Sequence, residues 1–102
     1  MGRHEGPPIP RPARPQYWIG WDPGQSQDYS AIAVLKKDAS GRYMVQHLER
    51  LPLGTPYPAQ VDLVHAMMHR RPLDKADVVL TVDATGVGQA VVDLARVKGD
   101  NP

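Results

Sequence analysis

The stretch that decides the fold is "YWIGWDPGQSQDYSAIAVL", residues 17–35. Two apolar runs, rich in residues that favour strands, flank a loop that contains Pro23 and Gly24. Residues 17–22 predict a first strand that ends at Asp22, and residues 29–37 predict a second strand. Because the Pro-Gly pair accounts for the turn by itself, the carboxylate of Asp22 is not needed to make it.

The pattern of strands continues downstream and then changes to helix. The turn at residues 38–42 leads into a strand over residues 43–51, whose alternation predicts one buried and one partly exposed face. From residue 59 to residue 70 the apolar spacing is helical, and Pro72 ends that helix. A continuous apolar run over residues 76–83 predicts a buried central strand, and residues 84–99 predict a second helix. The fold class is therefore α/β with the order βββαβα.

Length and composition limit the chain to one small folded domain. It has 102 residues, of which 41% are hydrophobic and 23% charged. Residues 1–16, rich in Pro and Arg, predict an extended tail or linker, which leaves residues 17–102 as the domain. The absence of cysteine excludes disulfides and thiolate metal sites, and no apolar segment is long enough for a signal peptide or a membrane span. We therefore expect a cytoplasmic protein without a membrane partner.

Two carboxylates stand at the ends of predicted strands. Asp22 ends the first strand and Asp83 ends the fourth, and the intervening helix makes the fourth strand parallel to an earlier one through a right-handed crossover. If the fourth strand lies beside the first, both carboxylates reach the same rim at a topological switch point. There they can hold Mg²⁺ or Mn²⁺, ions that prefer oxygen ligands and leave positions open for phosphate. The simpler alternative is that Asp22 starts a turn and Asp83 caps a helix.

With these carboxylates, the segments "GWDPGQSQDYSAIAVL" and "VDATGVGQAVVDL" resemble the RNase H-like nuclease domain of phage terminase large subunits and related prophage proteins. The resemblance covers residues 17 to about 98. It implies a metal-dependent endonuclease that hydrolyses DNA phosphodiesters during packaging with a metal-activated water, in the cytoplasm of a bacterial host. Asp22 and Asp83 are then the catalytic metal ligands, and Asp28, Ser30, Gly86 and Gly88 support the metal rim. The implied partners are double-stranded DNA and other terminase or portal components.

The chain also departs from that family. The family's core continues with a further strand and a helix that supplies a third acid. The resemblance therefore implies a domain shortened at its C-terminus, with an incomplete sheet and without the third catalytic acid. An exposed edge on the fourth strand then favours association with another copy. No GxxxxGK[ST] loop occurs, so no packaging motor is expected from this chain.

Other functions compete with the nuclease. A non-catalytic DNA-contact or assembly module needs only the folded core. Actin-like and sugar-kinase ATPases share the topology, and "DPGQS" and "DATGVG" resemble their phosphate loops, although a lid domain is missing. Net charge is only +1, so DNA contact depends on local groups, of which Arg50, Arg70 and Arg71 are candidates. His65 and His69, four residues apart on the first helix, are interpreted as a solvated helix edge.

Overall fold

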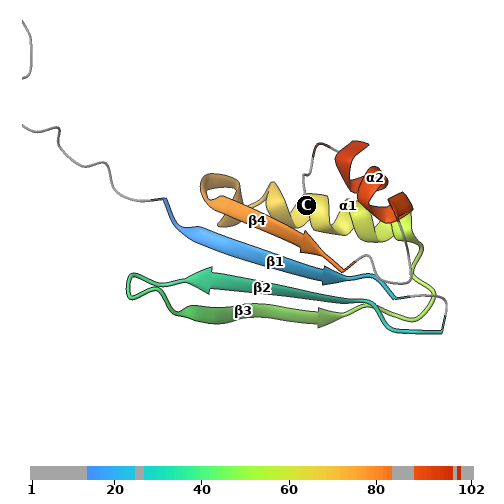
Figure 1. Ribbon diagram of the computed structural model, residues 1–102, viewed down its shortest axis with the longest axis horizontal. Helices are drawn as coiled ribbons and strands as arrows, with labels where there is room; N and C mark the ends of the chain where they lie inside the picture. Colours follow the sequence, from blue (N-terminus) through green and yellow to red (C-terminus); the bar gives the residue numbers. More distant parts are fainter. Residues whose placement is uncertain (1–13, 25–26, 84–88, 98, 100–102) are drawn as a thin grey trace, which may run out of the picture.

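The computed structural model describes residues 14–24, 27–83, 89–97 and 99. Its elements follow the predicted order, with one short 3₁₀ helix, η1, in the connection before the fourth strand. They are β1 (Gln16–Asp22), β2 (Ala31–Lys37), β3 (Tyr43–Arg50), α1 (Tyr57–Met68), η1 (Leu73–Lys75), β4 (Asp77–Val82) and α2 (Gln89–Val97) (Figure 1). The predicted α/β class is therefore confirmed.

A four-stranded mixed sheet in the order β3-β2-β1-β4 forms the centre of the fold. β1 pairs antiparallel with β2 and parallel with β4, as the helical crossover predicts. The parallel ladder extends beyond both strands, because the Asp77 N–H donates to the Pro15 carbonyl and the Asp83 N–H donates to the Trp21 carbonyl, each at 2.9 Å. The ordered sheet therefore begins slightly before the expected boundary at residue 17.

The prediction that the fourth strand is central and buried is wrong for the described sheet, in which β4 lies at the edge. The apolar residues of β4 lie on both faces of the strand. Leu80 is buried in the core, whereas Val79, on the opposite face, is 56% exposed. Apolar residues thus point both ways although only one face of β4 is covered, and a continuous run alone does not distinguish this from burial on both faces.

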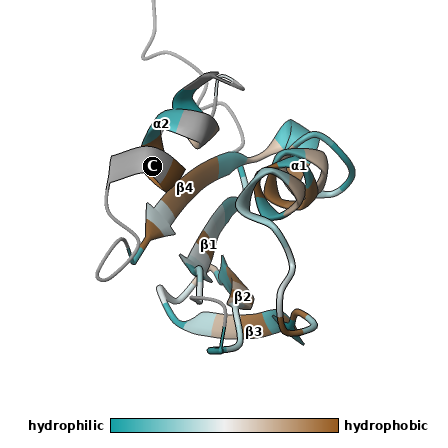
Figure 2. Ribbon diagram, turned by 90° about the vertical axis from the view of Figure 1, so that its right-hand side faces the viewer, coloured by the Kyte–Doolittle hydropathy of each residue, from teal (hydrophilic) through white to brown (hydrophobic). Residues whose placement is uncertain are grey.

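One face of the sheet carries the hydrophobic core. Alternate residues of β1 point to it, namely Tyr17, Ile19 and Trp21, and all are buried. α1 lies over this face and contacts α2, which lies beside β4 in the end-on view (Figure 2). The core is completed by Ile32, Val34, Leu51, Val61, Val64, Met67, Leu73, Leu80, Val91 and Ala95.

The other face of the sheet, called here the open face, is left exposed by the described helices (Figure 2). The strand registers and the alternation of side chains define its members in rows that cross the sheet from β4 to β3. The rows are Asp77, Gln16, Lys37 and Tyr43; Val79, Trp18, Leu35 and Val45; Thr81, Gly20, Ala33 and Leu48; and Asp22, Ala31 and Arg50. Asp83 extends the last row, because it follows Val82 and its N–H donates to the Trp21 carbonyl.

β3 differs from its prediction of one buried face. Seven of its residues are exposed and Glu49 is intermediate, because α1 does not reach over this edge strand. A bulge opposite Val34 and Leu35 also shifts the register, so that Val34 pairs with His47 and Leu35 with Val45. On the two sides of the bulge, the alternation of side chains between the two faces of β3 is therefore offset by one residue.

α1 begins two residues before the expected start at residue 59. Pro58 is tolerated in the first turn, where a backbone N–H has no partner within the helix, and Pro56 takes the N-cap position. The helix ends at Met68, and the His69 N–H donates to the His65 carbonyl at 3.2 Å. α2 is described from Gln89, so the predicted start at residue 84 lies outside the described residues. None of the helices in the described part has the length and apolar character that a membrane crossing requires.

A buried polar network fastens α1 to the sheet. The Trp21 Nε1–H donates to Gln60 Oε1 at 3.0 Å, and Gln60 Nε2–H donates to the Thr55 carbonyl at 2.8 Å. Both Trp21 and Gln60 are 1% exposed. Since a buried polar group without a partner is costly, this chain of bonds fixes the loop before α1 against the end of β1.

The turn between β2 and β3 is organised by Asp38. Its carboxylate accepts hydrogen bonds from the Ser40 hydroxyl at 2.6 Å and from the backbone N–H groups of Ser40 and Arg42 at 2.9 Å. Gly41 closes the turn with a φ of +89°, a value that favours glycine. The hydrogen bond from the Ser40 side chain, followed by that from the Arg42 backbone, lowers the pKa of Asp38 below its ordinary value of 3.8.

Asp38→Asn is expected to destabilise the protein modestly at neutral pH. Because the folded-state pKa of Asp38 is lowered, the stabilisation is fully present above the ordinary carboxyl pKa of 3.8 and is lost as the pH falls through the folded-state value. The difference in unfolding free energy between wild type and variant should therefore shrink below that pH. Urea unfolding across pH measures it, with Asp74→Asn on η1 as the control. A difference that does not change with pH would contradict this assignment.

Candidate functional site at the carboxyl ends of β1 and β4

Asp22 and Asp83 lie next to each other in register. Trp21 is paired with Val82 in the parallel ladder, and the Asp83 N–H continues it by donating to the Trp21 carbonyl. Neighbouring strands lie about 4.8 Å apart, and both residues belong to the open face. The predicted meeting of the two carboxylates at the ends of adjacent parallel strands is thus present in the backbone.

Asp22 and Asp83 line a shallow hollow of about 250 Å³. Its floor consists largely of small side chains, since Gly20, Ala31 and Ala33 occupy the middle of the sheet there. Thr81 and Leu48 flank this floor on β4 and β3. Both carboxylates are exposed, so a solvated ion and a bulky anionic ligand have access to them.

Arg50 ends the same row of the open face. Ala31 pairs with Asp22 on one side and with Arg50 on the other, which places Arg50 two strand spacings, about 10 Å, from Asp22. Its guanidinium lies 4.1 Å from the ring centroid of Tyr29, a cation–π contact. The row therefore combines two carboxylates and a guanidinium across a small alanine.

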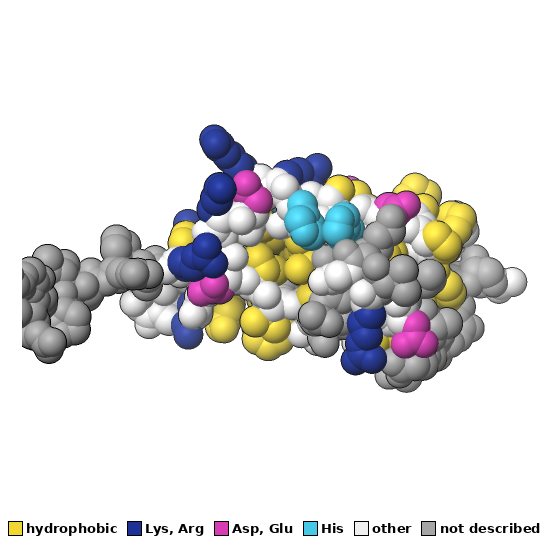
Figure 3. Space-filling view, turned by 90° about the horizontal axis from the view of Figure 1, so that it is seen from above, with side chains coloured by type: hydrophobic (Ala, Val, Ile, Leu, Met, Phe, Trp, Pro, Cys, Tyr) yellow, Lys and Arg dark blue, Asp and Glu magenta, His cyan; other side chains and the backbone are white. Residues whose placement is uncertain are grey.

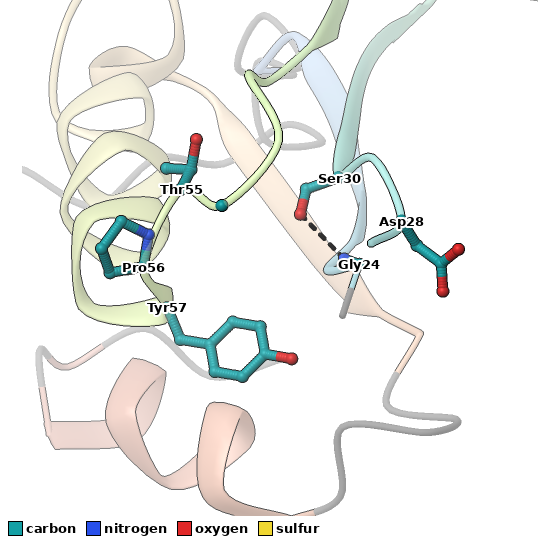
Figure 4. Close-up of a pocket in the computed structure, with 7 residues that line it drawn as sticks. Gly24, Asp28, Ser30, Thr55, Pro56 and Tyr57 are labelled. Atoms are coloured by element: carbon teal, nitrogen blue, oxygen red, sulfur yellow. Dashed lines mark hydrogen bonds between the residues drawn. The ribbon is translucent and has the colours of Figure 1, made fainter. Parts of the chain in front are cut away.

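Asp28 and Ser30 lie apart from the carboxylate pair. They line a different pocket of about 260 Å³, together with Gly24, Thr55 and Tyr57 (Figure 4). The Gly24 N–H donates to the Ser30 hydroxyl oxygen at 2.8 Å, so Ser30 fastens the connection between β1 and β2. The Asp28 side chain points away from this hydrogen bond in Figure 4. The structure thus gives Ser30 a local structural contact, and neither residue lines the hollow around Asp22 and Asp83.

The candidate DNA-contact arginines do not form one surface. Arg50 lies on the row of the carboxylates, whereas Arg70 and Arg71 line a pocket with His47 near the start of β1. In the view onto the helical side, most of the visible Lys and Arg side chains also gather toward one end of the molecule (Figure 3). Within the described residues, only Arg50 of the three is positioned beside the candidate site.

The sequence also singled out two glycines and two histidines. Gly86 and Gly88 lie outside the described residues. His65 and His69 are stacked with ring centroids 4.1 Å apart, and neighbouring histidines are visible on the helical side (Figure 3). In the described ranges, no group of three or more His, Asp or Glu side chains is arranged to hold a metal ion. Among the described residues, the carboxylates that line the hollow are those of Asp22 and Asp83.

Comparisons of the chain with protein-family models, with curated proteins and with solved structures gave no match.

Sequence reasoning missed the contacts that build the surroundings of the site. Thr55 and Tyr57 line the pocket beside Asp28, and Gln60 holds the Thr55 loop onto Trp21. Nothing in a single sequence distinguishes Gln60 from an exposed helical glutamine. The position of Arg50 could have been found from the sequence. Counting residue pairs outward from the turn at residues 38–42 places the end of β3 near the start of β2.

Proposed function

We propose that this protein is an RNase H-like, metal-dependent nuclease domain of the terminase type, acting on DNA phosphodiesters. The observation that carries the proposal is the alignment of Asp22 with Asp83 on adjacent parallel strands at one end of the sheet. The sheet order agrees with it, because β1 leads to β2 on one side and to β4 on the other, which makes this rim a topological switch point.

The donor set fits a hard divalent cation. Mg²⁺ is commonly held by one or two carboxylates, with water and substrate phosphate as its other ligands, and Mn²⁺ accepts the same oxygen donors. The carboxylates of Asp22 and Asp83 come from two neighbouring backbone segments that sheet hydrogen bonds hold in place. Metal binding therefore requires little further ordering of the backbone. When bound, such an ion supplies neutralisation of phosphate charge and a more acidic water.

The remaining residues of the site favour the approach of the substrate. Arg50 provides a positive charge for a neighbouring phosphate, and its stacking on Tyr29 limits the orientations of its side chain. Gly20, Ala31 and Ala33 keep the surface between Arg50 and the carboxylates low, so a nucleic acid backbone can approach. No covalent intermediate with the protein is required.

The test is a Mn²⁺ titration followed by residue-resolved NMR, together with a plasmid nicking assay. Paramagnetic broadening is expected first at Asp22, Asp83 and Ala31, and nicking is expected to fall to the level of a protein-free control in Asp22→Asn. Asp74→Asn, exposed on η1 away from the site, is the matched control and should behave as wild type.

Two outcomes would count against the nuclease. If neither Asp22 nor Asp83 responds to Mn²⁺, there is no metal site, and nicking that survives in Asp22→Asn arises elsewhere. ATP-dependent shifts at Gly24 would favour the phosphate-loop alternative. In the described structure the Gly24 N–H donates to Ser30, and the second loop of that alternative, residues 84–88, lies outside the described residues.

A further inference from the structure

The open face exposes an apolar band, and its first and last rows also carry charged side chains. Its large side chains are Leu48 at 72% exposure, Val45 at 66%, Val79 at 56%, Tyr43 at 49% and Trp18 at 38%. Trp18 and Tyr43 are in edge-to-face contact, with ring centroids 6.0 Å apart. A contiguous apolar area with a polar rim is the usual composition of a protein–protein interface.

The charges of the rim are divided between the two halves of this face. Asp22 and Asp77 lie on β1 and β4 and Asp83 directly follows β4, whereas Arg50 and Lys37 lie on β3 and β2. Asp77 is also 3.5 Å from Arg14 at its end of the sheet. Apart from Arg14, which pairs with Asp77, the acidic side chains of these rows lie on the β1–β4 half and the basic ones on the β2–β3 half, so the division runs parallel to the strands between β1 and β2.

We propose that the open face binds a second copy of this chain, about a two-fold axis that lies in the interface parallel to the strands. Such an axis places β1 opposite β2 and β4 opposite β3 while each row stays at the same level. The acidic half of each copy then faces the basic half of the other. Aligned sheets of this kind pack about 10 Å apart, with their strands within about 30° of each other.

The alternative symmetric arrangement is disfavoured by the same charges. An axis in the interface but perpendicular to the strands would keep each strand opposite its own copy and exchange the two charged rows. Asp83 would then approach Asp77 of the other copy, and Arg50 would approach the end that carries Lys37. No carboxylate of the open face would then lie directly opposite a basic residue of these rows, and Asp83 would face Asp77, which is unfavourable when they lose water.

Shape supports the same axis. The row of Gly20 contains Thr81, Ala33 and Leu48, so Leu48 of the second copy would face the half made of Thr81 and Gly20. A Cβ built at Gly20 has no neighbour within 4 Å, and the hollow of about 250 Å³ lies there. The most exposed leucine of one copy is thereby matched with the least filled part of the other.

This pairing would use the carboxylates of the proposed nuclease site. Arg50 of the second copy would lie over Asp22 and Asp83, so the dimer and a metal- or DNA-bound monomer would exclude each other. The dimer does not depend on the nuclease function, since it rests on apolar exposure and charge alone.

The first test is analytical ultracentrifugation over a range of concentrations. Wild type is expected to dimerise, and Leu48→Lys, which acts twice in a symmetric dimer, should raise the Kd about 100-fold or more. The matched control is Met44→Lys, equally on β3 and 48% exposed, but paired with Lys36 on the opposite face. A wild type that stays monomeric, or a dimer lost in Met44→Lys but kept in Leu48→Lys, would overturn the proposal.

The second test exchanges charges. Arg50→Glu and Asp83→Arg should each weaken the homodimer, whereas a mixture of the two variants should form heterodimers, because each carboxylate again meets an arginine. A mixture that remains monomeric while both variants are folded by circular dichroism would contradict the axis. Association unaffected by either variant would place it elsewhere, such as the β4 edge.

The effect of Mg²⁺ on dimerisation distinguishes the dimer proposal from the nuclease proposal. If both hold, Mg²⁺ should shift wild type toward monomer by occupying Asp22 and Asp83, and Asp22→Asn should reduce this shift. Heterodimers that form as expected but ignore Mg²⁺ would support the dimer and count against the metal site. Metal binding by a wild type that never dimerises would support the metal site and count against the dimer.

Discussion

Trp21→Ala is expected to lower the free energy of unfolding by about 3–5 kcal/mol, the largest loss for any single substitution considered for this chain. Trp21 is 1% exposed on the core face, at the end of a strand that is paired on both sides. Removing its ring opens a cavity between β1 and α1, and it also leaves Gln60 Oε1 without its donor. A small domain has little stability in reserve, so much of the population should unfold at 37 °C.

The packing and hydrogen-bond contributions of Trp21 can be separated. Trp21→Phe keeps most of the ring but removes the donor to Gln60, and should cost about 1–3 kcal/mol. Urea unfolding followed by circular dichroism measures both variants, at a concentration low enough for the chain to be monomeric. The control is Trp18→Ala on the open face, which should cost less than either. If Trp18→Ala were as destabilising as Trp21→Ala, the assignment of the two faces of β1 would be wrong.

The second large effect is expected for Gly24→Ala. A Cβ at this position would lie 2.7 Å from the Tyr29 carbonyl carbon and would also overlap the carbonyl oxygens of Asp28 and Tyr29. These are backbone atoms that cannot rotate away, so the connection between β1 and β2 must move. We expect a loss of about 1–3 kcal/mol and displacement of Ser30 from its hydrogen bond with the Gly24 N–H.

Gly20→Ala is the natural comparison for Gly24→Ala. Both glycines belong to the opening stretch, but a Cβ at Gly20 meets nothing within 4 Å, so the monomer should keep its stability or gain slightly. Amide NMR spectra would report the site of disturbance, with large shifts from Asp28 to Ala31 only in Gly24→Ala. Equal tolerance of both substitutions would mean that the loop is not packed as described.

The sequence predicted the backbone of the candidate site well because that part depends on strand order and strand ends. The apolar runs before Asp22 and Asp83, separated by a helix, are enough to place β4 parallel to an earlier strand.

The rest could not be predicted because it depends on which elements cover which strands. The alternation in β3 indicated a buried face, yet α1 does not extend over it, and the bulge opposite Val34 changes its phase. Asp28 and Ser30 follow the opening loop closely in sequence, but the loop carries them to a separate pocket beside Thr55. Side-chain direction after a turn is set by tertiary packing, which local patterns do not contain.

The pairing of β1 with β4 joins segments that are far apart along the chain, with the β2–β3 hairpin and α1 between them. A nascent chain on the ribosome can form the hairpin strands early from local contacts, but β1 must wait with one edge unpaired until β4 has been synthesised. Asp22 and Asp83 can therefore become neighbours only after β4 has been synthesised and the closure entropy of the long intervening segment has been overcome. Any chemistry that needs both carboxylates is thereby withheld from partly made or partly unfolded chains.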